Sequence, residues 1–169
     1  STSRSNTVSS DFVLAIHIDK DGILWFGTSS GLNKYHPKTD KFVHYGKKNG
    51  FKDEFINSIE EDKHNNLWIS TNRGIVKFNK YTSTVTCFDV FDGLQDNEFS
   101  SGINASLPDG RMIFGGINGF NVFHPDSIKA GNFSPNIVIT EFQLFSKNIE
   151  SGQKYSDDYQ MTKSIVDCD

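Results

Sequence analysis

The chain has 169 residues with 17 basic and 21 acidic side chains, so its net charge is −4. That balance argues against nucleic acid or an anionic membrane surface as the main partner, because both need a dense basic patch. Fifteen Phe, 5 Tyr and 2 Trp accompany 14 Gly and only 4 Pro. Rings and glycines in this proportion are typical of sheet proteins with tight turns, and they exclude a coiled coil, a helical bundle and a disordered tail.

The sequence contains three copies of one pattern. The copies are residues 21–35 (DGILWFGTSSGLNKY), 64–78 (HNNLWISTNRGIVKF) and 109–123 (DGRMIFGGINGFNVF). Trp25 and Trp68 hold the same place in the first two copies, 43 residues apart, and Ile113 takes that place in the third, 45 residues further on. A repeat of this length indicates stacked supersecondary units.

Within each copy the apolar residues follow the period of strands, not of helices. The first copy predicts strands over residues 14–18, 23–26, 32–35 and 42–45, and the second over 56–61, 67–70, 75–78 and 84–89. The dipeptides between the first two strands place Gly or Asn where a positive φ is expected; they are Asp21-Gly22, His64-Asn65 and Asp109-Gly110.

Four antiparallel strands in every 43–45 residues predict the blades of a β-propeller. One such sheet has two apolar faces and must stack on its neighbours to bury them. We expect Trp25 and Trp68 to fill the wedges between adjacent blades, since each ring buries ~150–250 Å². Gly27 and Gly115 are expected to let a neighbouring backbone approach closely.

The predicted fold class is therefore all-β, with three four-stranded blades of which the last is incomplete. We expect the end of a preceding blade or a linker at 1–13, blades at 14–55, 56–101 and 102–128, a linker at 129–135 and a further partial domain with a tail at 136–169. The third blade offers no clear fourth strand, and a new alternating apolar strand begins over 137–145.

A resemblance to a known family can be named from these motifs. The run LWFGTSSGL at 24–32, followed by Tyr35, resembles the two-component regulator propeller repeat. NEF at 97–99 and the run from Phe114 to Asp126 resemble the last blade of that family before the membrane. Residues 135–148 resemble the opening strand of the immunoglobulin-like domain, named for three tyrosines, that follows the propeller. The second and third copies depart from the pattern at Ser70 and Ile113.

The resemblance implies a fragment of the periplasmic sensor of a hybrid two-component system, an inner-membrane protein. Members of this family sense carbohydrate fragments and signal through one membrane helix to a cytoplasmic histidine kinase that controls transcription. The implied role of this chain is non-catalytic: it recognises an oligosaccharide or relays its binding, without a cofactor and without direct membrane contact.

In a propeller, the turns between second and third strands share one face with the connectors between blades. Polar side chains on that face could hydrogen-bond a sugar or pair with a carboxylate or sulfate. The candidate ligand-binding residues are Asn72, Arg73, Asn97, Glu98 and Asn118. The alternative is that these side chains only satisfy turn backbone and solvent.

Other chemistry has weak support in the sequence. His17, His44 and His64 have no second ligand at metal spacing, so no metal site is predicted. Nothing resembles a catalytic triad. Cys87 aligns with His44 in an outer strand, and we do not expect it to pair with Cys168.

Two other functions stay open. A propeller-type polysaccharide lyase or glycosidase would need carboxylates clustered on the central axis, and a purely structural or partner-binding segment would need none. Closed propellers have ~4–8 blades, so three blades leave two apolar flanks exposed. We therefore expect other blades of the same propeller as partners, and a homo-oligomer of the isolated chain, for example two copies completing a six-bladed ring.

Overall fold

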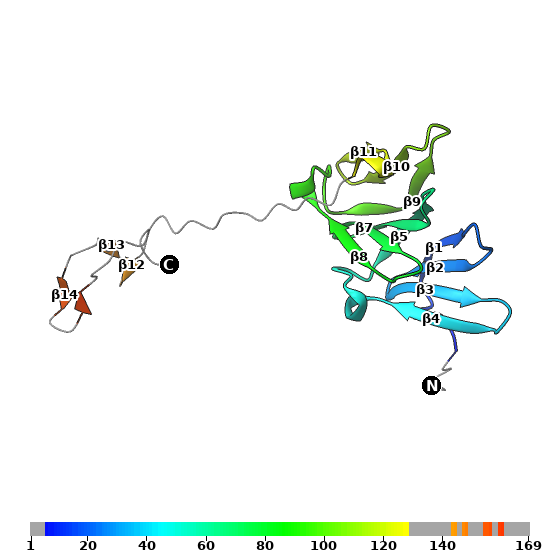
Figure 1. The fold of residues 1–169 in the computed structure, drawn as a ribbon, viewed down its shortest axis with the longest axis horizontal. Coiled ribbons are helices and arrows are strands. Elements are labelled where there is room, and N and C mark those ends of the chain that lie inside the picture. The colour runs from blue at the N-terminus through cyan, green and yellow to red at the C-terminus, as the bar shows by residue number, and fades with distance from the viewer. Residues whose placement is uncertain (1–5, 129–142, 145–146, 149–153, 157–158, 161–169) are drawn as a thin grey trace. The chain divides into compact units, whose positions relative to one another are not determined.

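The computed structural model describes residues 6–128 and the short strands at 143–144, 147–148, 154–156 and 159–160 (Figure 1). The chain divides into two compact units, Ser1–Lys129 and Ala130–Asp169, and each is described by itself. Among the described residues the regular elements are strands, apart from three short 3-10 turns. None of the helical segments in this part of the chain is long and apolar enough to cross a membrane.

Three antiparallel sheets build the first unit, each with its strands in chain order (Figure 1). The first contains β1 (Val13–Ile18), β2 (Leu24–Thr28), β3 (Gly31–His36) and β4 (Lys41–Tyr45). The second contains β5 (Ile56–Glu61), β6 (Asn66–Thr71), β7 (Gly74–Asn79) and β8 (Val85–Phe88). The third contains β9 (Phe99–Ser106), β10 (Met112–Gly116) and β11 (Gly119–Phe123). The predicted all-β fold of propeller blades is confirmed.

The 3-10 turns are η1 (Lys47–Asn49), η2 (Val90–Asp92) and η3 (Pro125–Ser127). The first two lie in the connectors that lead from one sheet to the next. The third sheet starts earlier than the predicted boundary at residue 102, because β9 begins at Phe99 and reaches Gly116 of β10 across a bulge.

The turn between first and second strands has the same form in all three sheets. The backbone N–H of Gly22 donates to the carbonyl three residues earlier at 2.9 Å, and Asn65 and Gly110 do the same at 3.3 and 2.9 Å. Their φ angles are 73°, 63° and 89°, so the positive φ expected from the sequence is confirmed. Glycine and asparagine adopt this backbone with least strain.

The two tryptophans fill the wedges between successive sheets. Trp25 is fully buried, and its ring centroid lies 5.8 Å from that of Phe78 in the second sheet. Trp68 is 1% exposed and lies 4.9 Å from Phe123 of the third sheet. The expected position of both rings is confirmed.

The glycine prediction is confirmed at one position and needs correction at the other. A Cβ on Gly27 would lie 2.5 Å from a methyl carbon of Ile56, so the second sheet does approach this backbone closely. At Gly115 the close neighbour is Ile103, which belongs to the same sheet. The β9–β10 register shifts between Phe114 and Gly116, so this contact lies at an irregularity of the pairing.

In the second unit, β12 (Gln143–Leu144) pairs antiparallel with β13 (Lys147–Asn148), and β14 (Lys154–Ser156) with β15 (Tyr159–Gln160). Of the strand expected over 137–145, only Gln143 and Leu144 lie within the described residues. The expected linker at 129–135 and Cys168 lie outside them, and of residues 135–148, which resemble the opening of the immunoglobulin-like domain, only 143–144 and 147–148 lie within them.

Candidate functional site

The turns between second and third strands lie against the connectors that lead to the next sheet. The backbone N–H of Gly31 donates to the carbonyl of Glu54 at 2.7 Å. The equivalent pair one repeat later is Gly74 and Asn97, also at 2.7 Å. One edge of the sheets therefore carries both the turns and the connectors.

All five candidate residues lie on this edge, around the connector between β8 and β9. Asn72 and Arg73 form the turn that precedes β7, and Asn97 is bonded to that turn. The carbonyl of Glu98 accepts a hydrogen bond from the N–H of Ile117 at 3.3 Å. That bond joins the connector to the turn of the third sheet, which contains Asn118.

Asn72 is tied to a buried polar residue on the inner strand β5. Its side-chain oxygen accepts a hydrogen bond from Asn57 at 2.8 Å. Asn57 is 1% exposed, donates to the carbonyl of Phe99 at 2.7 Å and accepts from Ser101 at 2.8 Å. Asn57 was not among the residues expected from the sequence, although the copies differ here, since the first has Leu14 at the equivalent position.

Asn97 and Asn118 also use their polar groups within the protein. The side-chain oxygen of Asn97 accepts from the N–H of Val90 at 3.2 Å. Gln95 accepts two hydrogen bonds from Asn118. Its side-chain oxygen accepts from the Asn118 backbone N–H at 3.0 Å, and its carbonyl oxygen accepts from the Asn118 side chain at 3.4 Å. Gln95, which likewise was not expected from the sequence, keeps a buried side-chain nitrogen without a hydrogen-bond partner among the described residues.

Arg73 and Glu98 differ from the three asparagines. Both are exposed, and their backbone N–H groups bond to Thr71 (3.0 Å) and Asp96 (3.5 Å). Across residues 6–128, the guanidinium of Arg73 and the carboxylate of Glu98 have no protein partner. The edge therefore combines fixed amides with two charged groups whose hydrogen-bonding capacity is available to a ligand.

The opposite edge of the sheets holds a buried ionic cluster. The ammonium of Lys80 lies 3.1 Å from Asp19, 2.8 Å from Asp21 and 2.7 Å from Glu61. Its side chain is 1% exposed. Burial lowers the pKa of Lys80, but the hydrogen bonds to the three carboxylates outweigh burial, so the pKa is raised. Because two of the acids belong to the first sheet's turn, the cluster joins the first two sheets.

Two aspartates hold the tryptophan rings in the wedges. Asp19 accepts a hydrogen bond from the indole N–H of Trp25, and Asp62 from that of Trp68, each at 2.9 Å. Burial raises the pKa of both carboxyls, but hydrogen bonds from side chains and backbone N–H groups outweigh it, so both pKa values are lowered. The third copy has apolar residues where the first two have the aspartate and the tryptophan, so the hydrogen-bond acceptor and its donor are replaced together. These residues are Leu107 and Ile113.

The inner strands β1, β5 and β9 show how acidic side chains are used near the axis. Their carboxylates belong to Glu60 and Glu61. Glu60 accepts from Asn104 and Ser106, both at 2.7 Å, while Glu61 pairs with Lys80. Within the described residues there is also no group of three His, Cys, Asp or Glu that could hold a metal ion. The lyase or glycosidase alternative therefore gains no acid–base pair from these strands.

Comparison with known proteins supports the resemblance found in the sequence. The family model described as "Two component regulator propeller" matches residues 7–30 and 50–73. "Histidine kinase P4" from Formosa agariphila is 32% identical over 82 residues, which cover 48% of this chain and 6% of that protein.

Among solved structures, the extracellular domain of a hybrid two-component system from B. thetaiotaomicron matches 85% of this chain and 21% of its own, with 27% identity and a TM-score of 0.71. Virginiamycin B lyase from Staphylococcus aureus matches 70% of this chain and 43% of its own, with 12% identity and a TM-score of 0.52, which shows a shared fold alone. This chain thus spans less than half the length of each of these proteins. The predicted resemblance to the two-component regulator propeller is confirmed.

Proposed function

We propose that this chain, which contains two-component regulator propeller repeats, is part of the extracellular sensor domain of a hybrid two-component system. The kinase named above and the extracellular domain from B. thetaiotaomicron support this assignment. In this proposal the chain is non-catalytic and periplasmic, and it binds the signal or relays its binding to a membrane histidine kinase that controls transcription.

The proposed ligand is an oligosaccharide, bound at the edge that carries Asn72, Arg73, Asn97, Glu98 and Asn118. The supporting observation is that Arg73 and Glu98 are exposed without a protein partner, while the asparagines beside them are held by hydrogen bonds. Sugar hydroxyls both donate and accept, so a guanidinium and a carboxylate complement them. Because hydrogen bonds already hold the neighbouring asparagines in place, ordering them on ligand binding costs little entropy.

The proposed partner is a preceding blade of the same propeller, docked on the first sheet. The second sheet buries Ile59 against the first sheet, leaving it 4% exposed. The equivalent residue of the first sheet, Ile16, is 64% exposed. The same repeat position is therefore buried where a preceding sheet is present and open where none is described. Homo-oligomer formation by the isolated chain stays a prediction.

The oligosaccharide proposal is tested by titrating the complete sensor with a panel of plant and algal oligosaccharides in a calorimeter. Replacing Arg73 with Ala should weaken the binding sugar roughly tenfold or more, since a hydrogen bond to a charged group contributes about 1.5–3 kcal/mol. Arg111→Ala is the matched control, because Arg111 is an exposed arginine at the opposite edge, paired with Asp109. Unchanged affinity in Arg73→Ala, or equal loss in the control, would remove this edge from consideration.

A further inference from the structure

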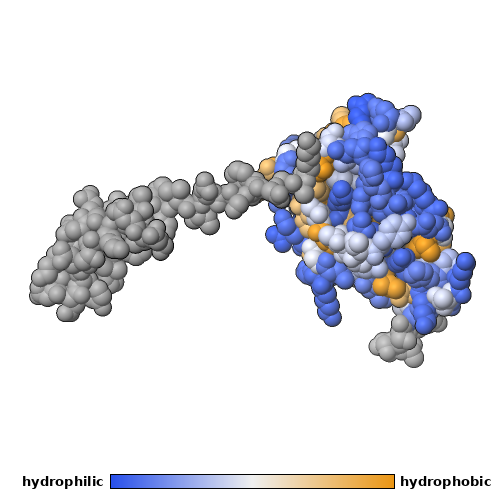
Figure 2. Space-filling model, in the orientation of Figure 1, coloured by the Kyte–Doolittle hydropathy of each residue, from blue (hydrophilic) through white to orange (hydrophobic). Residues whose placement is uncertain are grey.

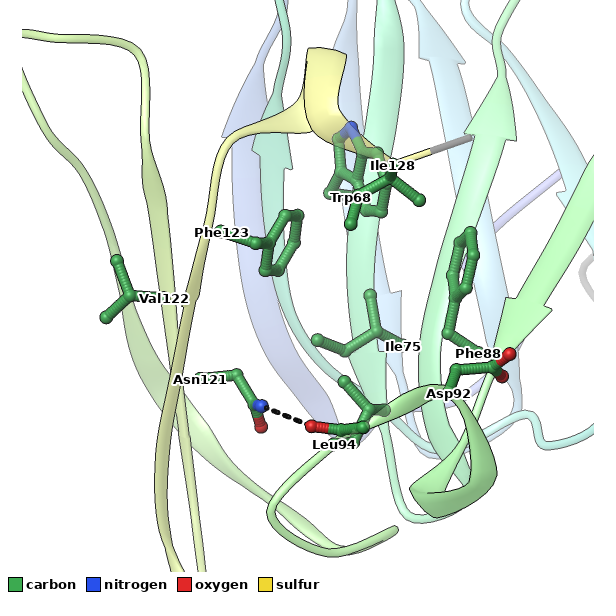
Figure 3. Close-up of a pocket in the computed structure, with 10 residues that line it drawn as sticks. Trp68, Ile75, Phe88, Asp92, Leu94, Asn121, Val122, Phe123 and Ile128 are labelled. Carbon is green, nitrogen blue, oxygen red and sulfur yellow. Dashed lines mark hydrogen bonds between the residues drawn. The ribbon is translucent and has the colours of Figure 1, made fainter. Parts of the chain in front are cut away.

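The wedge between the second and third sheets contains a cavity of about 150 Å³. Figure 3 shows apolar side chains from both sheets and from the β8–β9 connector turned toward a common space, while Val122 points away from it. The apolar lining consists of Trp68, Ile75, Phe88, Leu94, Phe123 and Ile128. Three residues of the β8–β9 connector, Asp92, Gly93 and Leu94, line the cavity, but none of the five residues proposed to bind sugar does.

The amide of Asn121 and one carboxylate oxygen of Asp92, both at the rim of this cavity, are already hydrogen-bonded within the protein. The side-chain oxygen of Asn121 accepts from the N–H of Gln95 at 3.0 Å, and its nitrogen donates to the carbonyl of Gly93 at 3.4 Å. The carboxylate of Asp92 accepts from the N–H of Asp89 at 2.9 Å. A sugar entering here could reach the carboxylate of Asp92 at the rim, but its other hydroxyls would lie against apolar side chains and lose hydrogen bonds to water.

The wedge between the first and second sheets indicates which side-chain shape fills the equivalent space. Between the first and second sheets, the buried ring of Phe51 lies 5.9 Å from that of Phe78. The repeat places Leu94 at the position of Phe51 and Phe123 at the position of Phe78. Where the first wedge holds a phenyl ring beside its phenylalanine, the second therefore has a smaller side chain and open space.

We propose that this cavity binds one apolar six-membered ring, such as the phenyl group of a small molecule. A cavity of 150 Å³ lined by apolar side chains is the size that admits benzene. Two walls are aromatic: Trp68 stacks on Phe88 with centroids 5.6 Å apart, and Phe123 lies tilted beside it. The volume is well below the ~300 Å³ at which pockets for drug-sized ligands begin, so it accommodates a single ring. The proposal is independent of the sensor function.

The test is a titration of the isotope-labelled 169-residue chain with toluene, followed by NMR of the methyl groups of Ile75, Leu94 and Ile128. We expect saturable shifts of these methyl signals with a millimolar dissociation constant. Glucose, a ring of similar size that carries hydroxyls, should give no saturable shift at the same methyl groups. Absence of saturation with toluene, or equal shifts with glucose, would overturn the proposal.

Substitutions at the two equivalent residues, Leu94 and Phe51, show in which wedge toluene binds. Leu94→Phe places a phenyl ring in the cavity. We therefore expect it to weaken toluene binding at least tenfold, as measured from the methyl signals of Ile75 and Ile128. Phe51→Leu is the matched control in the other wedge and should leave toluene shifts at those methyls unchanged. Circular dichroism checks that each variant is folded. If Leu94→Phe does not fold, Ile128→Phe narrows the same cavity from the η3 side. Undiminished binding in a folded filling variant would contradict the site.

Discussion

The two wedges between successive sheets use the same repeat positions but are filled to different degrees. In the first, Trp25 packs with Phe78, which also contacts Phe51, and all three rings are buried. In the second, Trp68 packs with Phe123 beside a cavity. The repeat thus specifies which residues meet across a wedge, while the filling depends on side chains that vary from copy to copy.

The ionic contacts are also more buried in the first wedge than in the second. In the first, Lys80 is buried among carboxylates from both sheets. In the second, Asp126 pairs with Lys63 and His64, whose side chains are 65% and 61% exposed. Exposed pairs contribute little because water and salt screen them, whereas an unpaired charge left in a buried cluster is costly. The first wedge should therefore respond more strongly to mutation.

The largest expected effect comes from the tryptophans. Trp25→Ala should lower the free energy of unfolding by about 4 kcal/mol, because a fully buried ring is removed from a filled wedge. Trp68→Ala should cost roughly 1 kcal/mol less, since that ring already borders a cavity. Urea denaturation of both variants measures the difference. Equal or reversed losses would mean that the two wedges are equally well packed.

The buried cluster ranks second. Lys80→Ala leaves Asp19 and Glu61 without their cation and should lower the free energy of unfolding by about 3 kcal/mol. Lys63→Ala in the second wedge is the control and should produce no measurable change, because Lys63 is exposed. A neutral Lys80→Ala variant would show that the cluster does not hold the sheets together.

The smallest expected effect is a pH dependence that belongs to the first wedge. Burial lowers the pKa of His17 below its ordinary value of 6.5, against the opposing influence of Glu61 and Asp19. The folded chain then binds fewer protons than the unfolded chain just below pH 6.5, so stability should fall as the pH drops through that window. His17→Gln should flatten the dependence between about pH 5 and 6.5. Parallel urea midpoints for both proteins across this range measure it, and an unaltered slope in His17→Gln would assign the effect elsewhere.

Much of the fold could be predicted because the repeat encodes it locally. The alternation of apolar residues gave the strands, and Gly22, Asn65 and Gly110 gave the turns, since a positive φ limits the residue types at those positions. The wedge position of Trp25 and Trp68 followed from the need to bury two sheet faces. The five candidate residues could be placed on one edge for the same reason, as propeller topology fixes which loops share it.

The features that could not be predicted depend on contacts between copies. Lys80 stands in a polar turn, and its burial arises only when Asp19 and Glu61 reach it from two different sheets. Gln95 supports Asn118 across the connector, a pairing that no spacing rule contains. The cavity depends on Leu94 standing where another copy has Phe51, which becomes meaningful only once the wedges are compared.

The exposed face around Ile16 has a consequence for how such chains change in length. It is the equivalent of the face that buries Ile59, so each unit of 43 residues carries both halves of its own junction. A tandem duplication of one unit would add one more junction of the same kind and leave both end faces as they were. Growth by whole units therefore repeats the backbone junction, while the side chains that fill each wedge follow the copy that supplies them.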